Sequence, residues 1–182
     1  MGLTEETFES LLEAARTGAD WAWAELYREL AGPVAGYLVS RGAGEPEDLT
    51  SETFLQVARH VHAFTGNLSQ FRSWVFVIAH RRLLDDRRRS RRRPQMVEME
   101  NETPAGDVED EAVERLVTAE MRAAFEQLSD PQRDVLALRI IAGLSLSETA
   151  DVVGKKVGAV KALQRRAIVS LQAKLDSEEV SI

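Results

Sequence analysis

The amino-acid sequence predicts an all-α protein made of two small helical domains joined by a flexible acidic linker. Along most of the chain apolar residues recur at intervals of three and four rather than two, which is the spacing of an amphipathic helix. Residues 94–112 interrupt this pattern with acidic side chains and two prolines, a composition typical of a linker. The chain has 182 residues, of which 44% are hydrophobic, and this is enough to form a core on each side of the linker.

The first two helices are expected within residues 4–42. Thr4 is a preferred N-cap residue and starts a helix that ends near Gly18. A second helix begins near Asp20, is interrupted at residues 32–33 by Gly-Pro, and resumes until residue 42. Its aromatic side chains are expected to pack in the core; they are Trp21, Trp23 and Tyr27.

Two further helices are expected before the linker. Pro46 suits the first position of a helix that runs to residue 64. Its buried stripe comprises Leu49, Phe54, Val57, Val61 and Phe64. Residues 65–70 form a loop, and a long helix then starts near Ser69 or Gln70 and ends at Pro94. Its apolar side comprises Trp74, Val75, Ile78 and Ala79, and its basic side His80, Arg81 and Arg88.

The second domain, residues 113–182, has the pattern of a helix-turn-helix. A helix over residues 113–128 is followed by a new helix start at Ser129, which ends at Gly143. Ser145 and Glu148 have capping-box spacing and open a short helix that Gly154 closes. The last helix spans residues 157–175 and is expected to bury Val160, Leu163, Ala167 and Leu171.

Charge is strongly segregated along the chain, although the formal net charge is -7. Residues 81–93 carry a net charge of +6, residues 94–114 contain eight acidic residues and no Lys or Arg, and residues 152–175 contain six basic residues and no acidic one. This pattern predicts that both domains contact one polyanion. Gln164 and Arg165 can pair with base edges in a major groove. Phe71 and Trp74 precede the arginine run and could stack on unpaired bases, although Trp74 fits a core position equally well.

Composition excludes several other classes of protein. The chain has no cysteine, which excludes a disulfide framework and a thiolate zinc site and favours a cytoplasmic location. Its longest apolar run falls far short of the roughly 20 residues that span a bilayer, so no membrane insertion is expected. No convincing catalytic constellation is present, and we expect no enzyme activity, no cofactor and no metal site.

Four segments together resemble a known family. They are PEDLTSETFLQVARHVHAF, FRSWVFVIAHRRLLDDRRR, LSDPQRDVLALRIIAGLSLSETADVVG and GAVKALQRRAIVSL. In this order and spacing they are similar to extracytoplasmic-function sigma factors, the minimal two-domain members of the sigma-70 class. The resemblance implies that residues 1–93 correspond to sigma region 2, which binds core RNA polymerase and recognises and melts the minus-10 element. It implies that residues 113–182 correspond to sigma region 4, which reads the minus-35 element, with residues 94–112 as the linker.

The resemblance also implies roles for individual residues of this chain. The expected contacts with core RNA polymerase are Asp48, Leu49, Glu52, Phe54 and Gln56. The expected contacts with minus-10 DNA are Asn67, Ser69, Phe71, Arg72, Trp74, His80, Arg81, Arg82, Arg87 and Arg88. The expected contacts with minus-35 DNA are Lys155, Lys156, Ala159, Lys161, Ala162, Gln164, Arg165 and Arg166. Because the family usually has Thr, Ser and Arg where this chain has Ala159, Ala162 and Leu163, its specificity is expected to depend on Gln164, Arg165 and DNA shape.

Family members are usually held inactive by an anti-sigma factor, so such a partner is expected, together with core RNA polymerase and promoter DNA. The acidic linker is expected to lie along the polymerase channel that later carries RNA. Two other classes remain open from the residues alone. One is a helix-turn-helix regulator whose first domain senses or dimerises, and the other is a nucleic-acid-processing enzyme that uses Asp85, Asp86 and Glu148.

Overall fold

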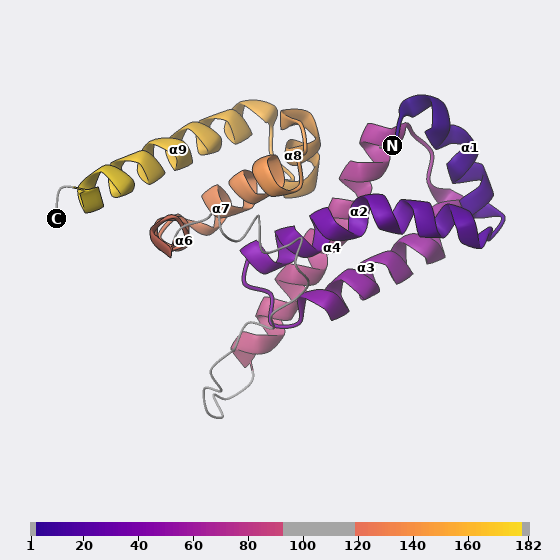
Figure 1. Ribbon diagram of the computed structural model, residues 1–182, viewed down its shortest axis with the longest axis horizontal. Coiled ribbons are helices and arrows are strands. Elements are labelled where there is room, and N and C mark those ends of the chain that lie inside the picture. The colour runs from indigo at the N-terminus through magenta and orange to yellow at the C-terminus, as the bar shows by residue number, and fades with distance from the viewer. Residues whose placement is uncertain (1–2, 93–118, 180–182) are drawn as a thin grey trace.

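A computed structural model describes residues 3–92 and 119–179, and in this part of the chain every regular element is a helix (Figure 1). The N-terminal elements are α1 (Glu5–Arg16), α2 (Asp20–Ser40), α3 (Pro46–His60), the 3₁₀ helix η1 (Val61–Ala63) and α4 (Leu68–Arg92). The C-terminal elements are α6 (Ala119–Glu126), α7 (Asp130–Leu136), the π-helix η2 (Ala137–Ile141), α8 (Leu146–Val153) and α9 (Val157–Glu179). The predicted all-α class is confirmed. Within the described ranges no helix is long and apolar enough to cross a bilayer.

The predicted helix ends depend on local capping. Thr4, Ser129 and Ser145 each begin a helix with a capping box, so side chains satisfy amide groups that have no acceptor within the helix. Gly154 ends α8 at φ 63°, a left-handed conformation that favours glycine. The turn between α8 and α9 therefore has the predicted helix-turn-helix geometry.

The interruption predicted at residues 32–33 is wrong, because Pro33 lies inside the continuous helix α2. A proline inside a helix removes one backbone hydrogen bond and costs about 3 kcal/mol. The buried stripe of α2 continues past it through Val34, Tyr37 and Leu38, all fully buried. Burial of such side chains contributes about 1.5–3 kcal/mol each, which is enough to offset the proline.

The core of the first domain forms where α2, α3 and α4 pack together. The predicted stripe of α3 and η1 is buried at Leu49, Phe54, Val57 and Val61, with Phe64 partly buried beside it. The aromatic residues of α2 depart from prediction. Trp21 is 63% exposed near the start of α2, and Tyr27 is 47% exposed although its ring packs on Phe54 of α3 with a centroid separation of 4.8 Å. Trp23 is half-buried, and its indole Nε1 donates a hydrogen bond to the Ala15 carbonyl oxygen at 3.1 Å.

The two domains pack directly against each other, which the sequence analysis did not predict. Helix α4 lies against α8, and α2 lies against η2 (Figure 1). Leu138, Ala142, Leu144 and Val152 of the second domain belong to the same buried cluster as the core residues of α1–α4. The predicted linker, residues 94–112, and the predicted helix start at residue 113 lie outside the described residues.

Candidate nucleic-acid and polymerase interface

The polymerase-binding residues expected on α3 divide between its surface and its core side. Asp48 is exposed, and Glu52 and Gln56 are half-buried next to Arg82. The Arg82 guanidinium lies 3.2 Å from Glu52 Oε2 and donates to Gln56 Oε1 at 2.8 Å. Leu49 and Phe54 are buried in the domain core, which corrects the expectation that they contact polymerase directly. Their side chains pack the inner side of α3 against the domain core.

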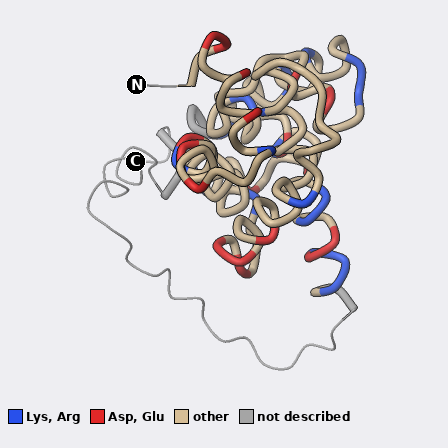
Figure 2. The backbone as a smooth tube through the Cα atoms, turned by 90° about the vertical axis from the view of Figure 1, so that its right-hand side faces the viewer, with Lys and Arg blue, Asp and Glu red and all other residues tan. Residues whose placement is uncertain are grey.

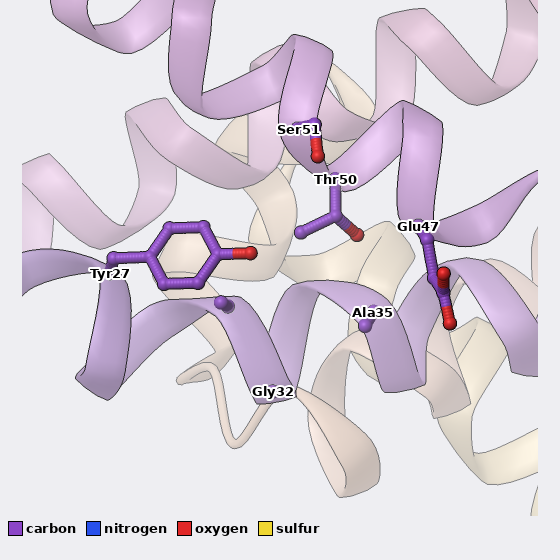
Figure 3. A pocket seen from close by; sticks show the side chains of 7 residues that line it. Tyr27, Gly32, Ala35, Glu47, Thr50 and Ser51 are labelled. Atoms are coloured by element: carbon purple, nitrogen blue, oxygen red, sulfur yellow. The ribbon is translucent and has the colours of Figure 1, made fainter. Parts of the chain in front are cut away.

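A groove of about 370 Å³ lies between α2 and α3, beside this surface (Figure 3). It is lined by Tyr27, Ala31, Gly32, Ala35, Glu47, Thr50 and Ser51. Small residues of α2 form the hollow, and a Cβ atom added at Gly32 would meet nothing within 4 Å. Sequence reasoning missed this groove, although the run AGPVAG at residues 31–36 was a usable signal because small side chains leave space beside a helix.

The loop expected to read the minus-10 element is closely held by its own polar groups. Asn67 Oδ1 accepts from the Gln70 amide at 2.9 Å, and Gln70 Oε1 accepts from the Asn67 amide at 3.0 Å. These two bonds form a reciprocal cap at the start of α4. Asn67 and Ser69 are exposed, whereas Arg72 and Trp74 are half-buried.

Phe71 lies inside an aromatic cluster rather than on the surface. It is 1% exposed, and its ring centroid is 5.3 Å from that of Phe8 and 5.2 Å from that of Phe64. Trp74 stacks on Phe64 with a centroid separation of 5.1 Å. The expectation that Phe71 stacks on bases is therefore corrected, because its ring is part of the core. Trp74 keeps a partly exposed ring beside the loop.

The basic side of α4 contributes fewer accessible cations than its sequence suggests. In the C-terminal half of the helix one acidic pair, Asp85 and Asp86, stands between two groups of arginines (Figure 2). Arg81 and Arg88 are exposed, and Arg88 lies 3.3 Å from Asp85. His80 is buried, which corrects its placement on the basic side. Its Nδ1 shares a hydrogen bond of 2.7 Å with the Tyr37 hydroxyl. Burial lowers the pKa of His80, so the imidazole is mostly uncharged at neutral pH.

A buried ion pair joins the two domains behind this surface. Arg41, whose side chain is fully buried, donates from Nε to Asp134 Oδ1 at 2.6 Å and from Nη2 to Asp130 Oδ1 at 3.1 Å. Hydrogen bonding from Arg41 lowers the pKa of Asp130. Arg87 also lies 3.6 Å from Asp130 and donates to the Arg41 carbonyl oxygen. Arg87, an expected DNA contact, is thus engaged between the domains.

Two more of the expected minus-10 residues contact the second domain. The Ser69 hydroxyl donates to Glu148 Oε1 at 2.9 Å, and Arg72 Nη2 donates to the Ala142 carbonyl oxygen at 3.2 Å. Burial alone would raise the pKa of Glu148, but hydrogen bonds from Ser145 and Ser69 and the charge of Arg72 lower it. The second domain therefore covers part of the surface expected to bind minus-10 DNA.

The expected minus-35 surface is open to solvent. Seven of its residues are exposed and Gln164 is half-buried; the seven are Lys155, Lys156, Ala159, Lys161, Ala162, Arg165 and Arg166. They lie at the start and on the outer side of α9, whereas Val160 and Ala167 are fully buried on its inner side. Arg166 Nε donates a hydrogen bond to the Ala162 carbonyl oxygen of the same helix at 3.2 Å.

The three carboxylates of the alternative nuclease hypothesis do not meet. Asp85 contacts Arg88, and Glu148 is engaged with Ser145 and with Ser69 at the other end of α4. Sixteen residues of helix separate positions 69 and 85, which corresponds to about 24 Å. Among the described residues, no group of three or more His, Asp or Glu side chains is placed to hold a metal ion.

Comparison with known proteins identifies the family of this chain. The family models for sigma-70 region 2 and sigma-70 region 4 match residues 23–93 and 124–173. A probable RNA polymerase sigma-C factor of Mycobacterium bovis is 30% identical over 140 residues, covering 76% of this chain and 74% of the relative. The chain belongs to the sigma-70 family.

The share of a relative's length that this sigma factor covers differs among the other matches. The extracytoplasmic-function sigma factor BldN of Streptomyces coelicolor is 36% identical over 167 residues, covering 88% of this chain but only 63% of BldN. SigX of Bacillus subtilis is 27% identical, with 94% of this chain and 85% of SigX covered. Among solved structures, CnrH in complex with the cytosolic domain of CnrY matches with a TM-score of 0.68 and 25% identity, covering 92% of this chain and 96% of CnrH.

Proposed function

We propose that this sigma factor binds core RNA polymerase, directs it to promoters through minus-10 and minus-35 elements, and nucleates melting of the promoter. It acts in the cytoplasm and has no catalytic activity of its own. The observation that carries this proposal is the exposed, acid-free surface of α9 in the part of the chain that matches sigma-70 region 4. That surface combines cations for phosphates with Gln164 and Arg165 for base edges.

The polymerase-binding surface in this proposal is the outer side of α3 together with the groove beside it. Asp48 and Glu47 give it negative charge, and Leu55 is 57% exposed on the same helix. Exposed aliphatic and acidic side chains next to a hollow suit a protein partner, which can fill the groove with an apolar side chain and pair its cations at the rim.

Minus-10 recognition in this proposal requires the two domains to separate. Ser69 and Arg72 contact the second domain, and Arg87 contacts Asp130. All three side chains are expected to bind DNA and cannot do so while they hold these partners. Binding of core polymerase is proposed to hold the domains apart, with the acidic linker in the polymerase channel.

A protein inhibitor is part of the proposed cycle. The sigma factor RpoE of Bartonella quintana, which shares the fold with a TM-score of 0.63 at 19% identity, was solved in complex with the anti-sigma factor NepR. We propose that an anti-sigma factor likewise binds this chain. Such a partner would favour the closed arrangement of the domains and so keep DNA from the minus-10 surface.

Promoter-directed transcription tests the proposed function. Purified core RNA polymerase is mixed with the full chain and a library of randomised upstream sequences, and the starts of the transcripts are sequenced. Selective starts, with enrichment of bases near minus-10 and minus-35, are expected. A Lys161→Ala, Arg165→Ala variant should lose enrichment at minus-35. Transcription that is independent of the added chain would contradict the proposal.

A further inference from the structure

We propose that helix α1 positions the loop that reads the minus-10 element, and that Glu5 and Arg16 are its positioning residues. The inference rests on the proposed function of that loop. It goes beyond the family comparison, because α1 lies before residues 23–93, which the model for region 2 matches. Nothing in the sequence pattern assigns α1 a role in reading DNA.

The observation is that α1 contacts the loop at both of the loop's ends. The loop leaves η1 at Phe64 and enters α4 at Leu68. Arg16, the last residue of α1, donates from Nη2 to the Phe64 carbonyl oxygen. Glu5, the first residue of α1, accepts a hydrogen bond from the Leu68 amide at 3.1 Å. One rigid helix thus fixes the entry and the exit of the same short loop.

Each contact satisfies a backbone group that needs a partner. The Leu68 amide is in the first turn of α4, where amide groups have no acceptor within the helix. The Glu5 carboxylate supplies that acceptor and places a negative charge at the positive end of the helix dipole. The Arg16 guanidinium makes a charge-assisted bond to a carbonyl group, which is stronger than a neutral one. Its side chain is only 28% exposed and also pairs with Glu13.

Aromatic packing supports the same arrangement. Phe8 of α1 packs on Phe71, and Phe71 packs on Phe64 at the loop entry. Between the two fixed ends, Gly66 adopts φ 154°, and a Cβ atom there would lie 2.6 Å from Gln70 Oε1. The conformation of the loop is therefore determined by α1, by the cap at Asn67 and by Gly66.

The exposed side chains of the loop are the ones that could read a base. Thr65, Asn67 and Ser69 are exposed, whereas Phe64 and Leu68 at the loop ends are half-buried. Base discrimination requires donors and acceptors held within a fraction of an ångström of their partners. Release of the loop ends should therefore reduce selectivity for the base, while the groove and the outer surface of α9 stay unchanged.

Glu5→Ala and Arg16→Met, singly and together, test the inference in the full chain. The matched controls are Glu6→Ala, which removes the neighbouring exposed glutamate, and Arg28→Met, which removes an exposed arginine of α2. Glu5→Gln serves as a conservative variant, because its amide oxygen can still accept from the Leu68 amide. Two measurements are made on each protein.

The first measurement is amide hydrogen exchange over residues 64–70 in the free protein. The double variant is expected to exchange several-fold faster in this loop than the controls, with unchanged exchange in α9, and Glu5→Gln should lie near wild type. Equal loop exchange in the double variant and in the controls would overturn the inference, whatever the result with polymerase.

The second measurement is transcription by core polymerase from promoter pairs that differ at one minus-10 base. The double variant is expected to lower the ratio of the two transcript yields by about fivefold, roughly the effect of one or two lost hydrogen bonds. Yields from promoters with altered minus-35 elements should keep their wild-type ratio. If wild type itself shows no promoter selectivity, the proposed function fails. If wild type is selective and the double variant keeps its minus-10 ratio, the positioning role fails.

Discussion

Replacing Arg41 with methionine should weaken the contact between the domains more than any exposed charge substitution. Arg41 is fully buried and lies between the domains, where it pairs with Asp134 and Asp130. Methionine fills a similar volume without a charge. Asp134, only 14% exposed, would then lose its charge partner at 2.6 Å and face an apolar side chain.

The magnitude follows from how far each partner is buried. Removing one member of a buried ion pair costs about 3–5 kcal/mol, whereas an exposed pair contributes at most about 1 kcal/mol. Asp130 is 50% exposed and still has Arg87 and Arg133 nearby, so the removal of Arg41 costs this carboxylate little free energy. The lower end of the range applies, about 3 kcal/mol, because Asp134 can regain some water. In a chain of this size such a loss lowers the melting temperature by about 6–12 °C.

Two measurements separate undocking of the domains from general damage. The first is thermal unfolding of Arg41→Met beside Arg28→Met, whose exposed pair with Glu25 should be worth almost nothing. The second is energy transfer between dyes on Glu9→Cys and Gln172→Cys, one in each domain. Because the chain has no cysteine of its own, both positions can be labelled selectively. Lower transfer efficiency is expected in Arg41→Met before any unfolding.

A double-mutant cycle completes the test of the ion pair. Adding Asp134→Leu to Arg41→Met removes the unpaired carboxylate and should recover at least about 1 kcal/mol of the loss. The reasoning about the buried pair is refuted if Arg41→Met melts within about 2 °C of the Arg28→Met control and transfers energy as efficiently.

Three further predictions follow from single side chains. Folding should weaken as the pH falls below about 7.5, because the unfolded chain binds a proton at His80 near pH 6.5 whereas burial lowers the pKa of His80 in the fold; over this pH range the denaturant midpoints of His80→Gln should vary less. Glu148→Ala should lower the free energy of unfolding by about 1–2 kcal/mol through loss of the α8 cap, against little change in the exposed control Asp151→Ala, as measured in urea. Lys155→Ala should weaken DNA binding by the holoenzyme equally on all sequences and reduce the salt slope by about 1, whereas Arg165→Ala should relax selectivity at one minus-35 base.

Helix positions in this chain could be predicted because they depend on short-range signals. Thr4, Ser129 and Ser145 cap helices through side chains three residues away, and Gly154 adopts the left-handed conformation that a helix end favours. These signals are local, so the sequence contains all the information they need. The error at Pro33 shows the limit, because the burial of Val34 and Tyr37, which holds the helix together there, depends on α3 and α4.

Accessibility of the site residues could not be predicted in the same way. The helical spacing of apolar residues places His80 at the boundary between the apolar and the basic side of α4. In the structure its imidazole faces inward, where it shares a hydrogen bond with the buried Tyr37 hydroxyl of α2. The sequence analysis did not single out Arg41, because its partners at positions 130 and 134 are about 90 residues away in sequence. Contacts between domains produce no periodic pattern of apolar residues in the sequence of either domain.

The contacts between the domains offer the side chains that we propose to bind minus-10 DNA the same kind of partner that DNA would. Ser69 donates to a carboxylate oxygen and Arg72 to backbone carbonyl oxygens, just as they would donate to phosphate or base oxygens. In the free protein, DNA must therefore compete with acceptors that are already in place, and its apparent affinity is reduced by the fraction of molecules that are open. The buried Arg41 pair and the apolar cluster shared by the two domains determine that fraction, because Ser69 and Arg72 exchange one acceptor for another at little net cost. A loss of about 3 kcal/mol at Arg41 should then raise the affinity of the free chain for opened minus-10 DNA by up to about 150-fold, while affinity in the holoenzyme, where we propose that the domains are apart, should change little.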